Sequence, residues 1–133
     1  MKKVLCKFGV YPYLGANIPN WNNLGLDPDR VYAVLKNGNF IKQLHESMYG
    51  KEIPVYIGSP FHDRPEKFIS ESSYIDGIMF VNFDTNFELS AGYEVEAIKE
   101  SGEYIGVHYD IVMKNPILRN ITIVDRKLES LIA

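Results

Sequence analysis

Two glutamates, Glu88 and Glu94, have the spacing in this sequence that best suits chemistry. Ser90 lies between them and is a good N-cap residue, so Glu94 is expected in the first turn of a helix or just past it. The dipole of that helix would favour the ionised carboxylate by about 0.3–1 kcal/mol. An ionised carboxylate can act as a nucleophile while a second acid handles the proton of the leaving group. The alternative is an acidic first turn that only stabilises its helix.

Three further residues are candidates for a binding surface. Gly92 has no side chain, so a ligand could approach the backbone beside Glu94. Tyr11 and Tyr13 follow the first expected strand, where their rings could stack on a planar ligand or pack a loop. The one cysteine, Cys6, lies in an apolar run and is expected to be a buried small hydrophobic residue.

Several classes of site are not expected. No Cys/His spacing suggests zinc, and the glycines fit neither the dinucleotide-binding nor the P-loop spacing. The net charge is −3 and lysines and arginines do not cluster, which disfavours nucleic acid and anionic membranes as partners. No run approaches the about 20 apolar residues of a membrane span. We therefore expect a cytoplasmic protein without a signal peptide.

Apolar segments alternate with segments of helical character along the chain. Strands are expected at residues 4–10, 53–58, 78–83 and 104–109, with a further apolar segment at 120–124. Helices are expected at residues 27–50, 65–74, 90–100 and 126–132. Residues 11–15, 16–28 and 115–116 read as breaks or loops because of their Pro, Gly and Asn content. Such alternation predicts an α/β fold: a mainly parallel sheet flanked by helices, in a three-layer arrangement of Rossmann or flavodoxin type.

Two of the expected helices have an alternative in β-structure. Residues 31–48 follow a 3.6-residue apolar period, but Asn37-Gly38 between two apolar runs is also a hairpin signal. A helix broken near Gly38 would satisfy both patterns. Likewise, alternating residues on either side of Ser101-Gly102 could form a hairpin in place of the helix at 90–100. We favour the helix in both segments.

The segment from Asp76 to Tyr104 resembles the nucleoside 2-deoxyribosyltransferase family. The likeness lies in Asp76-Gly77-Ile78-Met79-Phe80-Val81, in Ala91-Gly92-Tyr93-Glu94-Val95 and in Gly102-Glu103-Tyr104-Ile105. Lys7-Phe8-Gly9 is similar to the family's opening strand, with Lys7 where the family has a tyrosine. The resemblance covers residues 3–13 and 57–118, and implies one domain of this type over residues 1–133.

The resemblance also implies roles for particular residues. Glu94 would be the nucleophile that attacks the anomeric carbon of a 2-deoxynucleoside, forming a covalent deoxyribosyl-enzyme, and Glu88 would be the helper acid. Lys7, Gly9, Tyr11, Tyr13, Asp76 and Gly92 would line the substrate site. Asn115 would be lent by a neighbouring subunit of a homo-oligomer. A second base accepting the sugar makes a transferase, and water makes an N-glycoside hydrolase. The mechanism that the resemblance implies needs no metal and no organic cofactor.

A second hypothesis is a protein without catalysis. Function depends on sites and not on folds, so a nucleotide-binding or partner-blocking protein would share the same motifs. In either case the expected ligand is a nucleoside or nucleotide.

Overall fold

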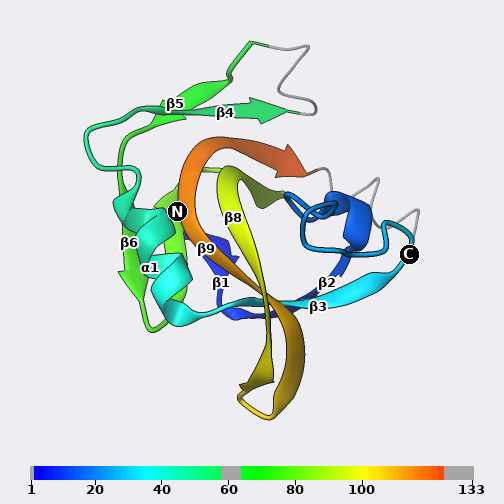
Figure 1. Ribbon diagram of the computed structural model, residues 1–133. Coiled ribbons are helices and arrows are strands. Elements are labelled where there is room, and N and C mark those ends of the chain that lie inside the picture. The colour runs from blue at the N-terminus through cyan, green and yellow to red at the C-terminus, as the bar shows by residue number, and fades with distance from the viewer. Residues whose placement is uncertain (1, 58–63, 125–133) are drawn as a thin grey trace.

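The computed structural model describes residues 2–57 and 64–124 of this chain. Its elements, in chain order, are β1 (Lys2–Lys7), β2 (Gly9–Leu14), a 3-10 turn (Gly15–Asn17), β3 (Val31–Lys36), α1 (Gly38–Glu46), β4 (Ile53–Ile57), β5 (Lys67–Ile69), β6 (Ser72–Ile75), β7 (Ile78–Asn82), β8 (Glu88–Tyr104) and β9 (Val107–Val124). The described part of the chain therefore holds one α-helix, and most of it is β-structure (Figure 1).

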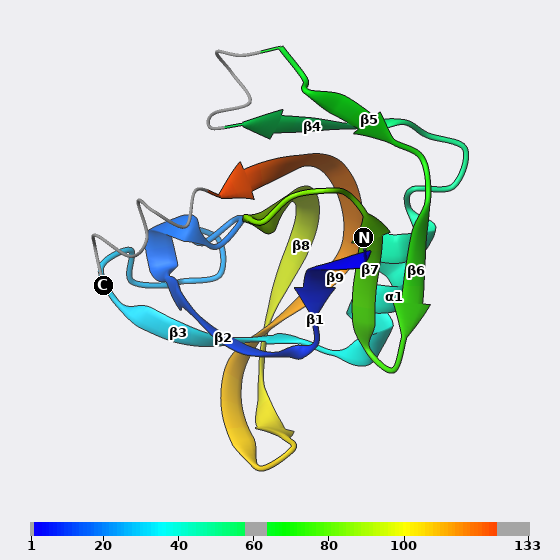
Figure 2. The same cartoon turned by 180° about the vertical axis from the view of Figure 1, so that it is seen from behind.

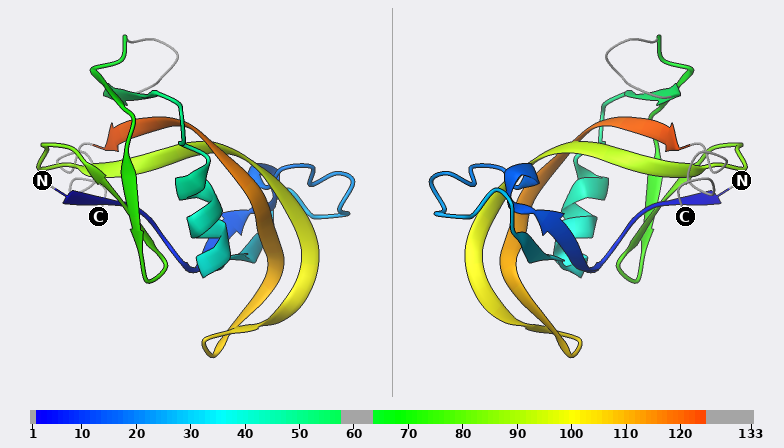
Figure 3. Two further views of the ribbon diagram at one scale, coloured as in Figure 1. Left: turned by 90° about the vertical axis from the view of Figure 1, so that its left-hand side faces the viewer. Right: turned by 90° about the vertical axis from the view of Figure 1, so that its right-hand side faces the viewer.

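Two sheets make up the fold. The smaller is antiparallel, in the order β1-β7-β6. The larger is mixed and has β9 at its centre: β8 pairs antiparallel along one edge of β9. On the other edge, β3 pairs in parallel at Ile111 and Val112, and β4 pairs in parallel from Ile121 to Ile123. β2 and β5 form the outer edges. The strands β8 and β9 curve around the molecule together (Figures 2 and 3).

The expected α/β fold with helices flanking a parallel sheet is wrong. The segment 90–100, expected as a helix, lies within β8, and the segment 65–74 forms β5 and β6. In β8 the apolar residues Leu89, Ala91 and Tyr93 alternate with polar ones, so a strand puts them all on one face. That face packs on the hydrophobic core, and β8 pairs along the 18-residue strand β9. Together these outweigh the helix propensity of the glutamates, which is worth about a few tenths of a kcal/mol per residue.

The segment 27–50 is divided at the point where its two patterns conflicted. Residues 31–36 form a strand, and Asn37 caps the helix that follows, its side chain accepting a hydrogen bond from the Phe40 amide at 2.8 Å. Asparagine is a favoured N-cap because it satisfies an amide that has no partner within the helix. The favoured continuous helix is therefore wrong in its first half. The alternative of a helix broken near Gly38 gave the right position, but the segment before the break is a strand and not a second helix.

Two prolines lie in strands where the sequence suggested breaks. Pro12 is in β2, an edge strand that pairs only with β3 among the described residues, so its missing amide costs no hydrogen bond on the outer side. Asn115-Pro116 lies in β9 at an irregularity of the β8 pairing, with Asn115 at φ 54°. The extra residue of a β-bulge accommodates both. The expected strands at 53–58 and 78–83 are present as β4 and β7, and the expected helix at 126–132 lies outside the described residues.

The core lies between the two sheets and around α1. The helix lies between the three-stranded sheet and β9 (Figure 3), and its inner face buries Phe40, Ile41 and Leu44 completely or nearly so. β9 contributes Ile111, Leu118 and Ile121 to the same core. The loop at 16–28 adds Ile18 and Leu26, and packs Trp21 against the cluster.

No helix in the described part of the chain is both long enough and apolar enough to cross a membrane.

Candidate functional site

A cleft of about 690 Å³ lies between β1 and the first residues of β8. It is lined by Lys2, Lys3, Val4, Leu5, Cys6, Lys7, Tyr11, Tyr13, Lys36, Glu88, Leu89, Ser90, Ala91 and Tyr93. The lining thus comes from four strands, β1, β2, β3 and β8, of which β8 is far from the other three in sequence. Its volume is that of a site for a small molecule.

Lys36 is the buried charge of this cleft. It ends β3 and is 7% exposed, the one charged residue among the buried side chains of the described chain. Its Nζ lies over three tyrosine rings, 4.9 Å from the ring centre of Tyr11, 4.8 Å from Tyr13 and 5.3 Å from Tyr93. The ammonium also donates a hydrogen bond to the Tyr13 hydroxyl. A desolvated cation over aromatic faces gains about 2 kcal/mol per strong contact, which offsets part of the cost of burial.

No carboxylate among residues 2–57 and 64–124 forms an ion pair with Lys36. The ion pairs among the described residues join His108 to Asp110 and Arg119 to Glu94, and neither includes Lys36. Three more lysines, Lys2, Lys3 and Lys7, line the cleft from β1, against the single acid Glu88. A cleft lined by charge of one sign attracts counter-charged ligands, here anions.

The other polar groups of the cleft are neutral donors. Burial raises the pKa of the Tyr93 hydroxyl, and nearby Tyr13 raises it further, so this phenol stays protonated. Burial likewise raises the pKa of the Tyr11 hydroxyl, which donates to the carbonyl of Lys7. Burial also raises the pKa of the Cys6 thiol, with Lys36 acting in the opposite direction, so Cys6 is a neutral thiol and not a reactive thiolate.

The structure brings together some of the residues expected at the site. Lys7, Tyr11, Tyr13 and Glu88 all line the cleft, although they belong to three strands. Gly9 begins β2 beside it, and a side chain at this position would meet the ring of Tyr11 at 3.3 Å.

Glu94 lies outside the cleft, on the opposite face of β8 from Tyr93. Its side chain is 65% exposed, and its carboxylate accepts a hydrogen bond from the Arg119 guanidinium at 2.8 Å. That hydrogen bond, together with the charge of Arg119, lowers the pKa of the Glu94 carboxyl. The residue is thus ionised, as expected, but the cause is a cross-strand arginine and not a helix dipole.

The remaining expected site residues have structural positions. Asp76 is in the β6–β7 turn at φ 50°. The side chain of Asn120 lies directly over Gly92, so close that a Cβ there would be 2.2 Å from its Oδ1. Asn115 donates a hydrogen bond to Glu96 at 2.9 Å. None of these three lines the cleft.

Sequence reasoning missed Lys36 and Tyr93. Lys36 belongs to a segment expected to be helical, where a lysine is ordinarily solvated, and Tyr93 was expected on a helix stripe. One signal could have indicated Tyr93. Leu89, Ala91 and Tyr93 occur at every second position, which is the pattern of a strand that places all three side chains on one face.

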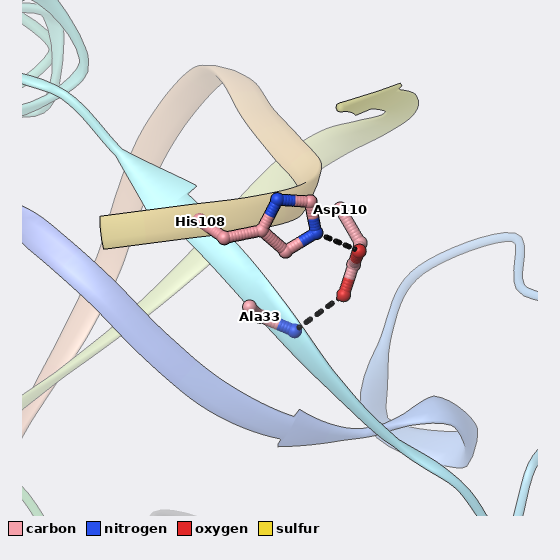
Figure 4. A network of polar contacts seen from close by, with 3 residues as sticks. All are labelled: Ala33, His108 and Asp110. Atoms are coloured by element: carbon pink, nitrogen blue, oxygen red, sulfur yellow. Dashed lines mark hydrogen bonds and ion pairs between the residues drawn. The ribbon is translucent and has the colours of Figure 1, made fainter. Parts of the chain in front are cut away.

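A second polar cluster joins β9 to β3 (Figure 4). Asp110 accepts a hydrogen bond from the Nε2 of His108 at 2.8 Å and a second from the Ala33 amide at 3.3 Å. Partial burial raises the pKa of Asp110, but the hydrogen bonds from His108 and Ala33 outweigh it, and the net pKa is lowered. The cluster extends the parallel pairing that begins at Val34 and Ile111, so its role is structural.

Among the described residues, no group of three or more His, Cys, Asp or Glu side chains is placed to hold a metal ion. Comparison with known proteins gives no relative: no family model, no curated protein and no solved structure matches this chain.

Proposed function

We propose that this protein binds a small anionic ligand, of the nucleotide class, in the cleft between β1 and β8, without transforming it. The observation that carries the proposal is the buried ammonium of Lys36, which has aromatic neighbours but no carboxylate partner among the described residues. A phosphate near this ammonium would gain a charge-assisted interaction in a partly desolvated place, where such contacts are strongest.

The lining of the cleft supports a ligand with both a charged and a planar part. The lysines of β1 border the cleft and add positive charge, and the phenols of Tyr11 and Tyr93 stay protonated. Tyrosine rings offer a face or an edge to a nucleobase. The volume of about 690 Å³ suits a nucleoside phosphate.

Binding without catalysis is favoured by the position of Glu94. A nucleophile has to reach the anomeric carbon of a bound nucleoside, and the Glu94 carboxylate faces away from the cleft and is hydrogen-bonded to Arg119.

The test is a binding experiment with nucleosides, nucleoside mono-, di- and triphosphates, and inorganic phosphate, by isothermal titration calorimetry. We expect the phosphorylated ligands to bind at least tenfold more tightly than the nucleosides. Lys36→Met keeps the length of the side chain but removes the charge, and should abolish this difference. Lys42→Met, an exposed lysine on α1 away from the cleft, is the matched control and should bind as the wild type does. Equal affinity of nucleosides and nucleotides, unaffected by Lys36→Met, would contradict the proposal.

Glycosyl transfer at Glu94 is the second candidate. It is favoured by one observation, the pKa of the Glu94 carboxyl, which Arg119 holds below its usual range so that the nucleophile would be ionised. Incubation with 2′-deoxynucleosides and a free acceptor base, followed by chromatography, tests it directly. This activity would be supported if the wild type exchanges bases, Glu94→Gln does not, and Glu96→Gln still does. The result would hold whether or not a neighbouring subunit contributes to the site. Absence of base exchange and base release in the wild type would exclude it.

A further inference from the structure

Two hairpin turns of this protein share one backbone conformation but differ in sequence. The β6–β7 turn has Asp76 at φ 50° and Gly77 at φ 81°, and the β8–β9 turn has Ile105 at φ 50° and Gly106 at φ 76°. Both join strands directly across two residues. Two-residue hairpin turns with two positive φ values favour Asn-Gly or Asp-Gly. The first turn follows this rule with Asp76-Gly77. The second turn has the β-branched Ile105 where Asn or Asp is favoured.

Ile105 is unfavourable in this position for two independent reasons. A β-branched side chain in the left-handed region is a true outlier, because its Cβ branches crowd the backbone. The side chain is also 74% exposed, and the nearby Val107 is 51% exposed, so burial within the chain does not offset the strain. Backbone strain of this kind is concentrated at functional sites.

The rest of the turn is held firmly in place. The rings of Phe8 and Tyr104 meet edge to face, with their centres 6.2 Å apart. Tyr109 lies across Gly102 on the neighbouring strand, so close that a Cβ there would be 2.5 Å from the phenol oxygen. The turn lies at the end of the arm formed by β8 and β9, which projects beyond the other strands in Figures 1 and 3. The arm therefore presents Ile105 and Val107 as a fixed apolar projection.

We propose that Ile105 and Val107 form a protein-docking tip, which inserts into an apolar socket bordered by basic residues on a partner protein. The charge near the tip supports this partner: Glu103 is exposed two residues before Ile105, and Glu100 is exposed on the same strand. The basic residues nearest in sequence, Lys99 and His108, lie outside residues 100–107. Acidic neighbours would repel an anionic lipid surface, and two exposed apolar side chains are too few for stable membrane binding. None of the tip residues lines the cleft of the proposed function, so the two inferences are independent.

The first test is of stability. Ile105→Asn introduces a residue that tolerates the left-handed region, so it should lower the unfolding equilibrium constant about fivefold, as measured by urea denaturation. Asp76→Ile makes the reverse change in the other turn and should raise that constant by a similar factor. If Ile105→Asn destabilises the protein, Ile105 stabilises the folded chain itself, and the proposal fails.

The second test identifies and measures the partner. A photo-crosslinking p-benzoylphenylalanine replaces Glu103 in cells that make the protein, and replaces Val31, an exposed apolar residue elsewhere, as the control. A protein that crosslinks only at position 103 is purified and titrated with three forms of this chain. We expect Ile105→Val to bind within about threefold of the wild type, and Ile105→Asn to bind at least about thirtyfold more weakly, as for a central apolar contact.

Three outcomes would overturn the proposal. The first is that no protein crosslinks at position 103 beyond those found at position 31, or that Ile105→Asn binds the captured protein as tightly as the wild type. The second is self-association in analytical ultracentrifugation that Ile105→Asn abolishes, because the tip would then dock on a second copy of this chain. The third is co-sedimentation with phosphatidylcholine or phosphatidylglycerol vesicles that depends on Ile105.

Discussion

At the scale of single residues, surroundings decide what each charged group does. Lys36 is buried among tyrosine rings and has no carboxylate partner within the described part of the chain, whereas Glu94 is exposed and paired with Arg119. Glu94 had the more suggestive sequence context, yet Lys36 has the environment of a binding residue. A buried, unneutralised cation is costly, so its retention is a stronger indication of function than an exposed acid.

Asp110 gives a prediction about pH. The hydrogen bonds from His108 and the Ala33 amide lower its pKa in the folded protein, despite partial burial. A carboxyl with a depressed folded pKa stabilises the protein above its unfolded pKa of about 3.9, and this contribution is lost as the pH falls through the folded pKa. Asp110→Asn should therefore be less stable than the wild type at pH 7, with the difference shrinking below about pH 4.

Urea denaturation at pH 7 and at pH 3 measures this difference. Glu71→Gln, at an exposed carboxyl outside this cluster, is the control and should match the wild type at both pH values. A constant difference between Asp110→Asn and the wild type across this range would contradict the assignment.

At the scale of elements, α1 shows how a local signal and tertiary packing cooperate. Asn37 ends the preceding strand pattern and caps the helix, and the inner face of the helix packs Ile41 and Leu44 into the core. A helix of nine residues is too short to be stable alone, so packing supplies most of its stability and the cap fixes where it starts.

The cap can be tested by substitution. Asn37→Ala leaves the Phe40 amide without its side-chain acceptor, and should lower the free energy of unfolding by about 1 kcal/mol in urea denaturation. Asn39→Ala, two residues further on and inside the helix, is the matched control. It should be neutral or slightly stabilising, because alanine is the better helix former. Equal destabilisation by both substitutions would mean that the cap has no special role.

At the scale of the whole molecule, the sheets join segments that are distant in sequence. Lys2 pairs with Asn82 across β1 and β7. The last described strand, β9, pairs with both β3 and β4. Such non-local pairing has to close large loops before it gains contacts, so the main folding phase should take milliseconds to seconds. Stopped-flow refolding followed by Trp21 fluorescence measures it. A main phase faster than about a millisecond would be inconsistent with this topology.

The apolar segments that became β4 and β7 were predictable because they combine β-branched residues with short length and clear boundaries. The segment 88–104 was not, because its apolar residues fit a helical stripe as well as a strand. For the site, the sequence indicated Lys7, Tyr11, Tyr13 and Glu88 one at a time. It contained no pattern that places them around Lys36.

The sequence by itself determined the positions of β4 and β7 and offered a break near Gly38 as an alternative, because these features depend on local conformational preference and spacing. Only the tertiary structure decided that β8 is a strand and that Lys36 is buried beneath three tyrosine rings. The physical reason is one of magnitude. Helix and strand preferences differ by roughly tenths of a kcal/mol per residue, whereas burying a large apolar side chain such as Leu89 contributes about 1.5–3 kcal/mol, and the partly buried Ala91 and Tyr93 add to this.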